Sequence, residues 1–125
     1  MAIDPRRADL ERFLSDDAGG PVVMLNLLRF RPDGGRAAYD AYLRAAAPHV
    51  ARVGGEVVYF GDGAPALVAE TGQAWDAVLL VRYPDRAALV AMIASPEYQA
   101  ITHLRSAALL ETVLQPTRPR RLGSP

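Results

Sequence analysis

The sequence contains no cysteine, which excludes a disulfide framework, a thiol nucleophile and a cysteine-ligated metal. It contains no lysine either: fourteen arginines are balanced by nine aspartates and five glutamates, so the formal charge at pH 7 is zero. Nucleic acids and anionic membranes attract proteins with an excess of positive charge, and this chain has none. We therefore expect no nucleic-acid partner. The absence of cysteine fits a protein of the reducing cytoplasm.

Long apolar runs are also missing. No run approaches the roughly 18 residues that a membrane-spanning helix needs. The opening residues, MAIDPRRADLERF, carry charges where a signal peptide has its apolar segment. We therefore expect no membrane association. Half of the residues are hydrophobic, and 125 residues are enough for one domain with its own core.

The motifs of common enzyme classes are absent as well. The sequence has no GxxxxGK[ST] loop, no HExxH, no GxSxG and no dinucleotide-binding GxGxxG. The two histidines, His49 and His103, are too few for a histidine-rich metal site, and the acidic pair Asp16-Asp17 falls in an expected surface loop. The sequence therefore predicts neither a metal nor a cofactor.

Hydrophobic spacing and turn residues predict the following elements. Asp4 as N-cap and Pro5 at the first helical position predict a short helix that ends between 15 and 20. The apolar stretch 21–30 predicts a strand, and the apolar stripe from 36 to 53 predicts a helix. Further strands are expected at 56–61, 76–83 and 111–115, and helices from 85 and from 96 to about 110.

This order, a helix followed by βαββαβ, predicts an α+β fold: a ferredoxin-like sandwich with an extra N-terminal helix. We expect three parts, namely an N-terminal helix and loop (1–20), the sandwich domain (21–115) and a flexible Arg/Pro tail (116–125). The first strand is apolar on both faces, although helices cover only one face of such a sheet. A large bare apolar face favours a partner surface, and the simplest partner is a second copy, giving a homodimer.

The stretch 21–115 resembles the dimeric α/β-barrel superfamily. Within it, Ser95-Pro96-Glu97-Tyr98-Gln99, followed by Arg105, resembles an uncharacterised family described only as a domain of unknown function. Relatives in the superfamily include muconolactone isomerase, stress-responsive barrel proteins, antibiotic-biosynthesis monooxygenases and haem-degrading oxygenases. The resemblance implies a dimer with a pocket between sheet and helices, but no particular reaction.

Three residues are candidates for the polar lining of that pocket. Tyr98 and Arg105 lie seven residues apart in the expected last helix and so share one of its edges. Together they could bind a carboxylate or an enolate, or they could form an internal hydrogen-bonded pair that holds the helix to the sheet. Asn26 interrupts an apolar strand, so its amide either bonds to a neighbour or faces a polar pocket.

Three further candidates come from the edges of apolar segments. His49 lies near Tyr42 on its helix and is either a pocket acid or base or a partner in a structural hydrogen bond near Pro48. Trp75, at the start of the third strand, forms either an aromatic wall or part of the core, whereas His103 is expected at the surface. The candidate ligand-binding residues are therefore Asn26, Tyr42, His49, Trp75, Tyr98 and Arg105.

Two functions are compatible with these residues. The first is a non-catalytic dimeric protein that holds a small acidic or aromatic ligand between helices and sheet. The second is a cofactor-independent oxygenase or isomerase of small aromatic or acidic compounds. For the second, the resemblance implies roles for Asn26, Trp75 and Arg105, which match residues of some superfamily oxygenases in type. Because no activated acid–base pair is evident, the sequence favours the binding protein and leaves open whether the chain is an enzyme.

Overall fold

The structure, a computed structural model, describes residues 3–123. Its elements run in the order α1 (Arg7–Ser15), β1 (Val22–Phe30), α2 (Gly35–Arg52), β2 (Glu56–Asp62), β3 (Ala77–Tyr83), α3 (Arg86–Ala94), α4 (Pro96–Gln99), α5 (Thr102–Ala108) and β4 (Leu109–Thr117). The predicted ferredoxin-like α+β sandwich with an additional N-terminal helix is confirmed.

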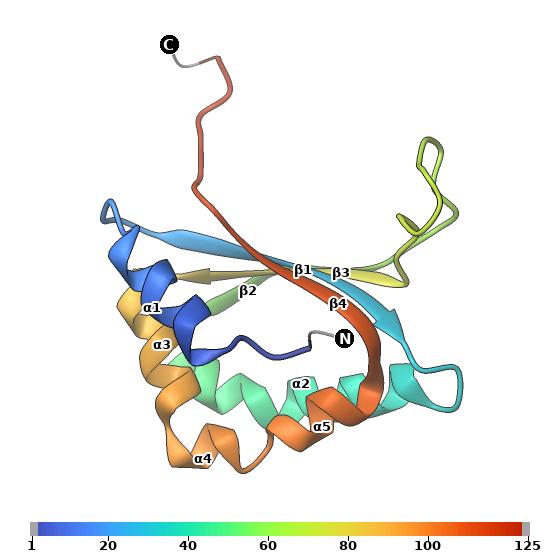
Figure 1. Ribbon diagram of the computed structural model, residues 1–125, viewed down its shortest axis with the longest axis horizontal. Coiled ribbons are helices and arrows are strands. Elements are labelled where there is room, and N and C mark those ends of the chain that lie inside the picture. The colour runs from blue at the N-terminus through green and yellow to red at the C-terminus, as the bar shows by residue number, and fades with distance from the viewer. Residues whose placement is uncertain (1–2, 124–125) are drawn as a thin grey trace.

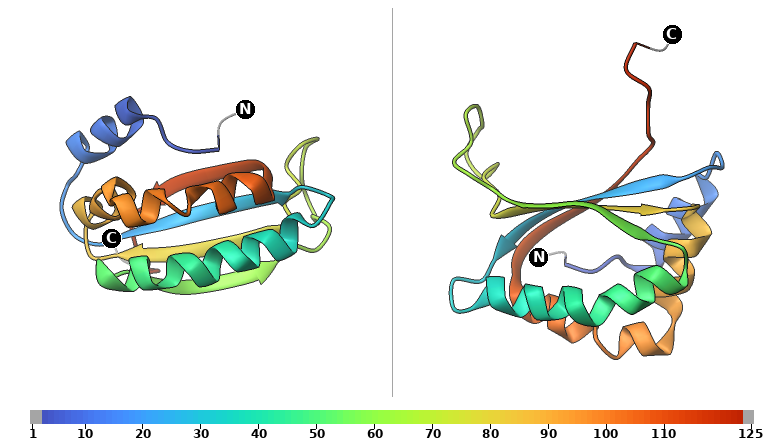
Figure 2. Two further views of the ribbon diagram at one scale, coloured as in Figure 1. Left: turned by 90° about the horizontal axis from the view of Figure 1, so that it is seen from below. Right: turned by 180° about the vertical axis from the view of Figure 1, so that it is seen from behind.

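The four strands form one antiparallel sheet in the order β2-β3-β1-β4. All helices lie on one side of this sheet, with α2 below the β2–β3 half and α5 below β1 and β4 (Figures 1 and 2). No helix formed by residues 3–123 covers the other side of the sheet. The molecule is therefore a two-layer sandwich with one open sheet face.

The central strand β1 alternates between a buried face and a partly exposed face. Its buried residues, on the helix side, are Val22, Met24, Asn26, Leu28 and Phe30. Its partly exposed residues, on the open face, are Val23, Leu25, Leu27 and Arg29. Strand β3 alternates in the same way, and Leu25 lies opposite Leu80 in the register. The apolar run of β1 thus reflects a covered face and an uncovered face that is also apolar.

The helices predicted from 85 and from 96 begin where expected, and each has a side-chain cap. The Asp85 carboxylate accepts a hydrogen bond from Ala88 N (2.8 Å), and the Ser95 hydroxyl accepts one from Tyr98 N (3.3 Å). The predicted start at Asp4-Pro5 is wrong. Helix α1 begins only at Arg7, because Asp4 is bonded to a distant helix instead.

The predicted helix from 96 to about 110 is also wrong in its extent. The chain forms α4, leaves the helical path at Ala100 and Ile101, and resumes as α5 before entering β4 at Leu109. Strand β4 is longer than predicted and includes Pro116, which lies opposite Met24. A proline is tolerated there because β4 is an edge strand, whose outer side needs no hydrogen bonds.

Two segments extend on the side of the sheet away from the helices: the loop 63–76 between β2 and β3, and residues 118–123 after β4 (Figure 1). At the tip of the loop, Leu67 and Val68 are 100% and 93% exposed. None of the helices within residues 3–123 combines the length and the apolar character required to cross a membrane.

Candidate functional site

A cavity of about 250 Å³ lies between the sheet and the helices. Strands β1, β2, β3 and β4 form one wall, α2, α3, α4 and α5 form the other, and Asp4 and Pro5 lie at the margin. Most of the lining is apolar, but several polar groups reach it: Asn26, Tyr39, Tyr42, Tyr83, Tyr98 and Arg105. The volume lies just below the range of about 300–1,000 Å³ that is usual for ligand pockets, so the cavity suits a small molecule.

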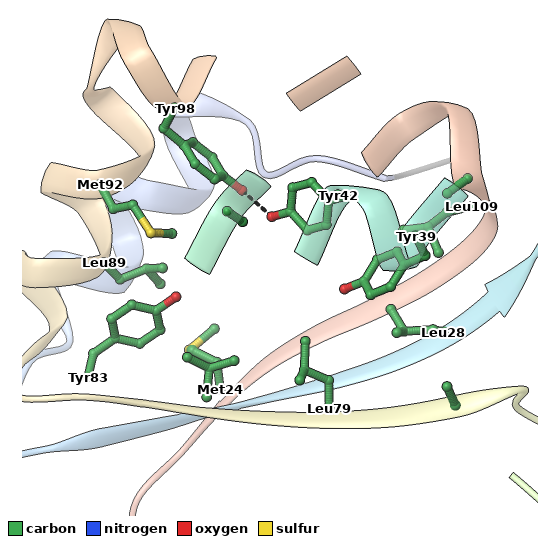
Figure 3. Close-up of a cluster of buried hydrophobic side chains, with 14 of the residues drawn as sticks. Met24, Leu28, Tyr39, Tyr42, Leu79, Tyr83, Leu89, Met92, Tyr98 and Leu109 are labelled. Carbon is green, nitrogen blue, oxygen red and sulfur yellow. Dashed lines mark hydrogen bonds between the residues drawn. The ribbon is translucent and has the colours of Figure 1, made fainter. Parts of the chain in front are cut away.

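Tyr42 and Tyr98 face each other across the helix layer. Their hydroxyl oxygens are 2.6 Å apart and share a hydrogen bond, drawn as a dashed line in Figure 3, and both residues are only 7% exposed. Since each hydroxyl carries one proton and the shared bond uses one, the accepting hydroxyl keeps a proton that it can donate to a further group. The pair is therefore both a structural contact and a potential donor at the cavity.

Tyr39 and Tyr83 approach the same space from opposite ends, with their hydroxyls directed inward (Figure 3). Burial raises the pKa of Tyr39 to about 12, an effect that the nearby Arg105 charge partly offsets. Burial raises the pKa values of Tyr42 and Tyr83 as well. These phenols consequently stay neutral at physiological pH and act as hydrogen-bond donors and acceptors, not as anions.

Arg105 is the one basic residue, and Asp4 the one acidic residue, among the described residues that line the cavity. The Arg105 side chain is 6% exposed, and its Nη1 donates to the Ile3 carbonyl and to Asp4 Oδ1 (3.0 Å). Its Nη2 is buried and has no hydrogen-bond partner within residues 3–123. A buried guanidinium nitrogen without an acceptor is costly, and an anion in the cavity would satisfy it.

Asn26 lies on the helix-facing side of β1 and is 6% exposed. Its amide nitrogen donates to the carbonyls of Met24 (3.3 Å) and Leu79 (3.4 Å). Both interpretations of its position in the sequence therefore apply together, because Asn26 bonds to neighbours and also lines the cavity. Both hydrogen bonds are longer than the usual range of about 2.7–3.2 Å and are therefore weak.

The structure brings four of the six candidate residues to the cavity: Asn26, Tyr42, Tyr98 and Arg105. The sequence predicts that Tyr98 and Arg105 share one helix, and this is wrong. Tyr98 belongs to α4 and Arg105 to α5. Tyr98 bonds to Tyr42 instead of Arg105. That these residues bind a ligand stays a prediction.

The other two candidates lie outside the lining. His49 packs edge-on against Tyr98, with 6.0 Å between ring centroids, and its Nδ1 is buried with no hydrogen-bond partner in the described part of the chain. The expected hydrogen bond near Pro48 is therefore not formed at that atom. Trp75 lies at the loop end of β3 with the Arg29 guanidinium 4.5 Å from its ring centre. His103 is exposed, as predicted.

The candidates named from the sequence did not include several lining residues, of which Tyr39, Tyr83 and Asp4 bear on the chemistry. Tyr39 could have been found, because it shares the apolar stripe of its helix with Tyr42. Tyr83 ends a strand of alternating burial, which places it on the same face as Leu79. Nothing in the sequence near Asp4 indicates that it lines the cavity, because its partner, Arg105, is 101 positions away. Within residues 3–123, no group of three or more acidic, histidine or cysteine side chains is placed to hold a metal ion.

Comparison with known proteins gives a family and a fold. Residues 34–114 match the family described as a domain of unknown function (DUF1330). The crystal structure of RPA0582, a protein of unknown function from Rhodopseudomonas palustris, is similar over 95% of this chain and 97% of that one, with 36% identity and a TM-score of 0.88. No protein of curated function matches the chain.

More distant structures share the fold alone. An uncharacterised NIPSNAP-like domain protein from Burkholderia xenovorans is 20% identical, covers 85% of this chain and 90% of its own, and has a TM-score of 0.59. A dimeric ferredoxin-like protein of unknown function from Jannaschia sp. CCS1 is 14% identical, covers 80% and 100% respectively, and has a TM-score of 0.61.

Proposed function

The chain belongs to the DUF1330 family of domains of unknown function, and we propose that it binds a small acidic ligand with an apolar or aromatic body in the cavity between sheet and helices. The observation that carries this proposal is the buried Arg105 Nη2, which has no partner within residues 3–123. The neutral phenols of Tyr39, Tyr42 and Tyr83 line the same cavity and supply polar contacts without adding negative charge of their own.

We further propose that the protein acts as a homodimer that joins through the open sheet faces. The partly exposed apolar residues of β1 and β3 support this arrangement, as do Leu67 and Val68 on a loop that extends past the same face. The Jannaschia protein of the same fold is described as dimeric, which also supports it. That this chain is located in the cytoplasm stays a prediction from its composition.

The binding proposal is tested by calorimetric titration with benzoate and with benzamide, its neutral counterpart of similar shape. We expect benzoate to bind at least 10-fold more tightly, because a charge-assisted hydrogen bond contributes about 1.5–3 kcal/mol. Arg105→Met should abolish the preference. Arg44→Met, which removes an exposed arginine outside the cavity, is the matched control and should retain it. Equal binding of benzoate and benzamide by the unaltered protein would refute the proposal.

The alternative function, a cofactor-independent oxygenase or isomerase, is favoured by one observation. The buried His49 Nδ1, which has no hydrogen-bond partner among residues 3–123, lies next to Tyr98, and Tyr98 in turn lines the cavity. From there the imidazole could move a proton. Incubation of the purified protein with a panel of electron-rich aromatic acids, without added metal, separates the two functions. Product formation that His49→Gln abolishes would establish the enzyme, whereas binding without turnover would support the binding protein.

A further inference from the structure

Residues 3–20, here called the N-terminal segment, start in the opening of the sandwich between β4 and α5 and continue into α1 (Figures 1 and 2). There it separates the cavity described above from a second cavity of about 390 Å³ beneath α1. The two cavities share six lining residues: Asp4, Pro5, Met24, Leu89, Ile93 and Leu114. Asp4 and Pro5 thus form part of a thin partition between two adjoining spaces.

This segment is held by few contacts. Helix α1 contains no buried residue. Ile3 and Phe13 are the segment's only residues that pack against the core, as partly buried side chains, among residues 3–20. Arg86 lies with its guanidinium 4.6 Å from the Phe13 ring centre and donates to the Phe13 carbonyl (2.8 Å), and Arg105 donates to the Ile3 carbonyl. The segment joins β1 through Gly19 and Gly20, both with positive φ. Local opening costs little where few apolar contacts are lost, so this part of the chain is suited to move.

The inner end of the segment is fixed by charge. Asp4 Oδ1 accepts from Arg105 Nη1 at 3.0 Å, and Asp4 Oδ2 is 3.4 Å from the Ser106 hydroxyl. The Asp4 side chain is 52% exposed, whereas that of Arg105 is 6% exposed. Asp4 can therefore return to water at little cost, but Arg105 cannot remain buried without an anion.

We propose that the Asp4 carboxylate occupies the position of the ligand's own carboxylate, so that a monocarboxylate binds by displacing Asp4 from Arg105 and releasing the N-terminal segment. This inference rests on the proposed function and specifies it: the ligand is a small monocarboxylate whose apolar body lies in the merged cavities. The segment is a lid that the ligand's charge opens.

Geometry favours the exchange. Asp4 engages only one of the two terminal nitrogens of Arg105, and the other has no partner within residues 3–123. A free carboxylate that enters from the cavity can accept hydrogen bonds from both terminal nitrogens. Such bidentate guanidinium–carboxylate pairs are stronger than pairs joined by a single hydrogen bond. A neutral ligand gains nothing from displacing Asp4, which makes opening selective for anions.

The test compares Asp4→Asn with Glu11→Gln by calorimetric titration with benzoate and benzamide. Both variants remove one negative charge from the N-terminal segment, but Glu11 lines neither cavity. We expect Asp4→Asn to bind benzoate about 10-fold more tightly than the unaltered protein does, because the internal competitor is weakened. Glu11→Gln should leave affinity unchanged, and neither variant should change benzamide binding by a similar factor. Unchanged or weaker benzoate binding by Asp4→Asn would overturn the inference.

A second measurement needs no variant. Hydrogen exchange of the unaltered protein, with and without saturating benzoate, should show faster exchange of the α1 amides and slower exchange of those in β1. Slower or unchanged exchange in α1 would refute the lid even if benzoate binds, which leaves the proposed function standing. If only Asp4→Asn binds benzoate, the inference is supported; if neither protein does, both the inference and the proposed function fail.

Discussion

The hydrogen bond between Tyr42 and Tyr98 joins α2 to α4 and permits a quantitative test of how the helix layer is held together. The substitutions are Tyr42→Phe, Tyr98→Phe and the double variant. Each removes a hydroxyl and keeps the ring, so packing in the core changes little. The bond is short, at 2.6 Å, and both residues are 7% exposed.

Each single variant leaves one buried hydroxyl without its partner. Such an orphaned group costs about 1–3 kcal/mol, and the adjoining cavity can admit water that lowers the cost, so we expect about 1–2 kcal/mol for each single variant. The double variant leaves no orphan, and replacement of both partners by apolar groups is nearly neutral. It should therefore lose no more stability than the worse single variant, which corresponds to a coupling energy of about 1–2 kcal/mol.

Urea unfolding followed by circular dichroism measures these free energies. All four proteins should be compared at one protein concentration, since the stability of a dimer depends on it. If the losses of the two single variants add in the double variant, the hydroxyls contribute independently and the interpretation of this contact is refuted. Loss of benzoate binding in Tyr98→Phe, with stability retained, would assign the hydroxyl to the ligand instead.

Three further predictions concern the dimer, the tail and alkaline pH. Light scattering should give a mass near twice the 13.5 kDa of one chain. The variant Leu25→Asp, which puts a charge on the open face, should give the mass of a single chain. A 13.5 kDa species for the unaltered protein at micromolar concentration would refute the dimer. Truncation after Thr117 should leave the melting temperature within a few degrees, because the residues beyond it lie outside the sheet; a larger loss would show that the tail packs across the dimer. The free energy of unfolding should fall as the pH rises from about 10 toward 12. Burial raises the pKa of Tyr39 in the folded state, so as the pH rises the phenol loses its proton in the unfolded chain first, which favours unfolding. A free energy of unfolding that stays constant to pH 12 would contradict this prediction.

The fold could be predicted because its elements depend on local patterns. The helix predicted at 36–53 is observed at Gly35–Arg52, since its apolar stripe spans five turns and sets its position regardless of context. The strand predicted at 76–83 is observed at Ala77–Tyr83, ended by Pro84. Periodicity over many residues and a residue that cannot continue the element both appear directly in the sequence.

The interruption between α4 and α5 could not be predicted. No glycine or proline occurs between 97 and 115, and Ile101, Leu104 and Ala108 continue the spacing of a helix. At the break, the Thr102 hydroxyl donates to the Gln99 carbonyl, and beyond it α5 packs against α2. At the other end of α5, the Ala108 carbonyl accepts a hydrogen bond from Arg31 N, where the chain enters β4. Tertiary contacts thus end a helix that its own residues would prolong.

The face of the sheet that Asn26 occupies was equally undetermined, because β1 is apolar on both sides and its pattern gives no register. The contact between Asp4 and Arg105 joins residues 101 positions apart. In the sequence, Asp4 followed by proline indicates a helix cap, a local role that is favourable in isolation. A partner far along the chain provided a stronger interaction, and local reasoning cannot reveal such a competitor.

Arg105 itself is hard to explain by stability. Replacing a buried ion pair with well-packed apolar side chains is often neutral or stabilising by about 1–4 kcal/mol. The guanidinium here has one carboxylate partner, which is half exposed, and a second terminal nitrogen with none within residues 3–123. A methionine or leucine at this position would stabilise the folded protein more than the arginine does. Binding of a carboxylate ligand, in contrast, requires the arginine. The same reasoning accounts for Asp4: in the empty protein it supplies the negative charge without which Arg105 would be a buried, uncompensated cation.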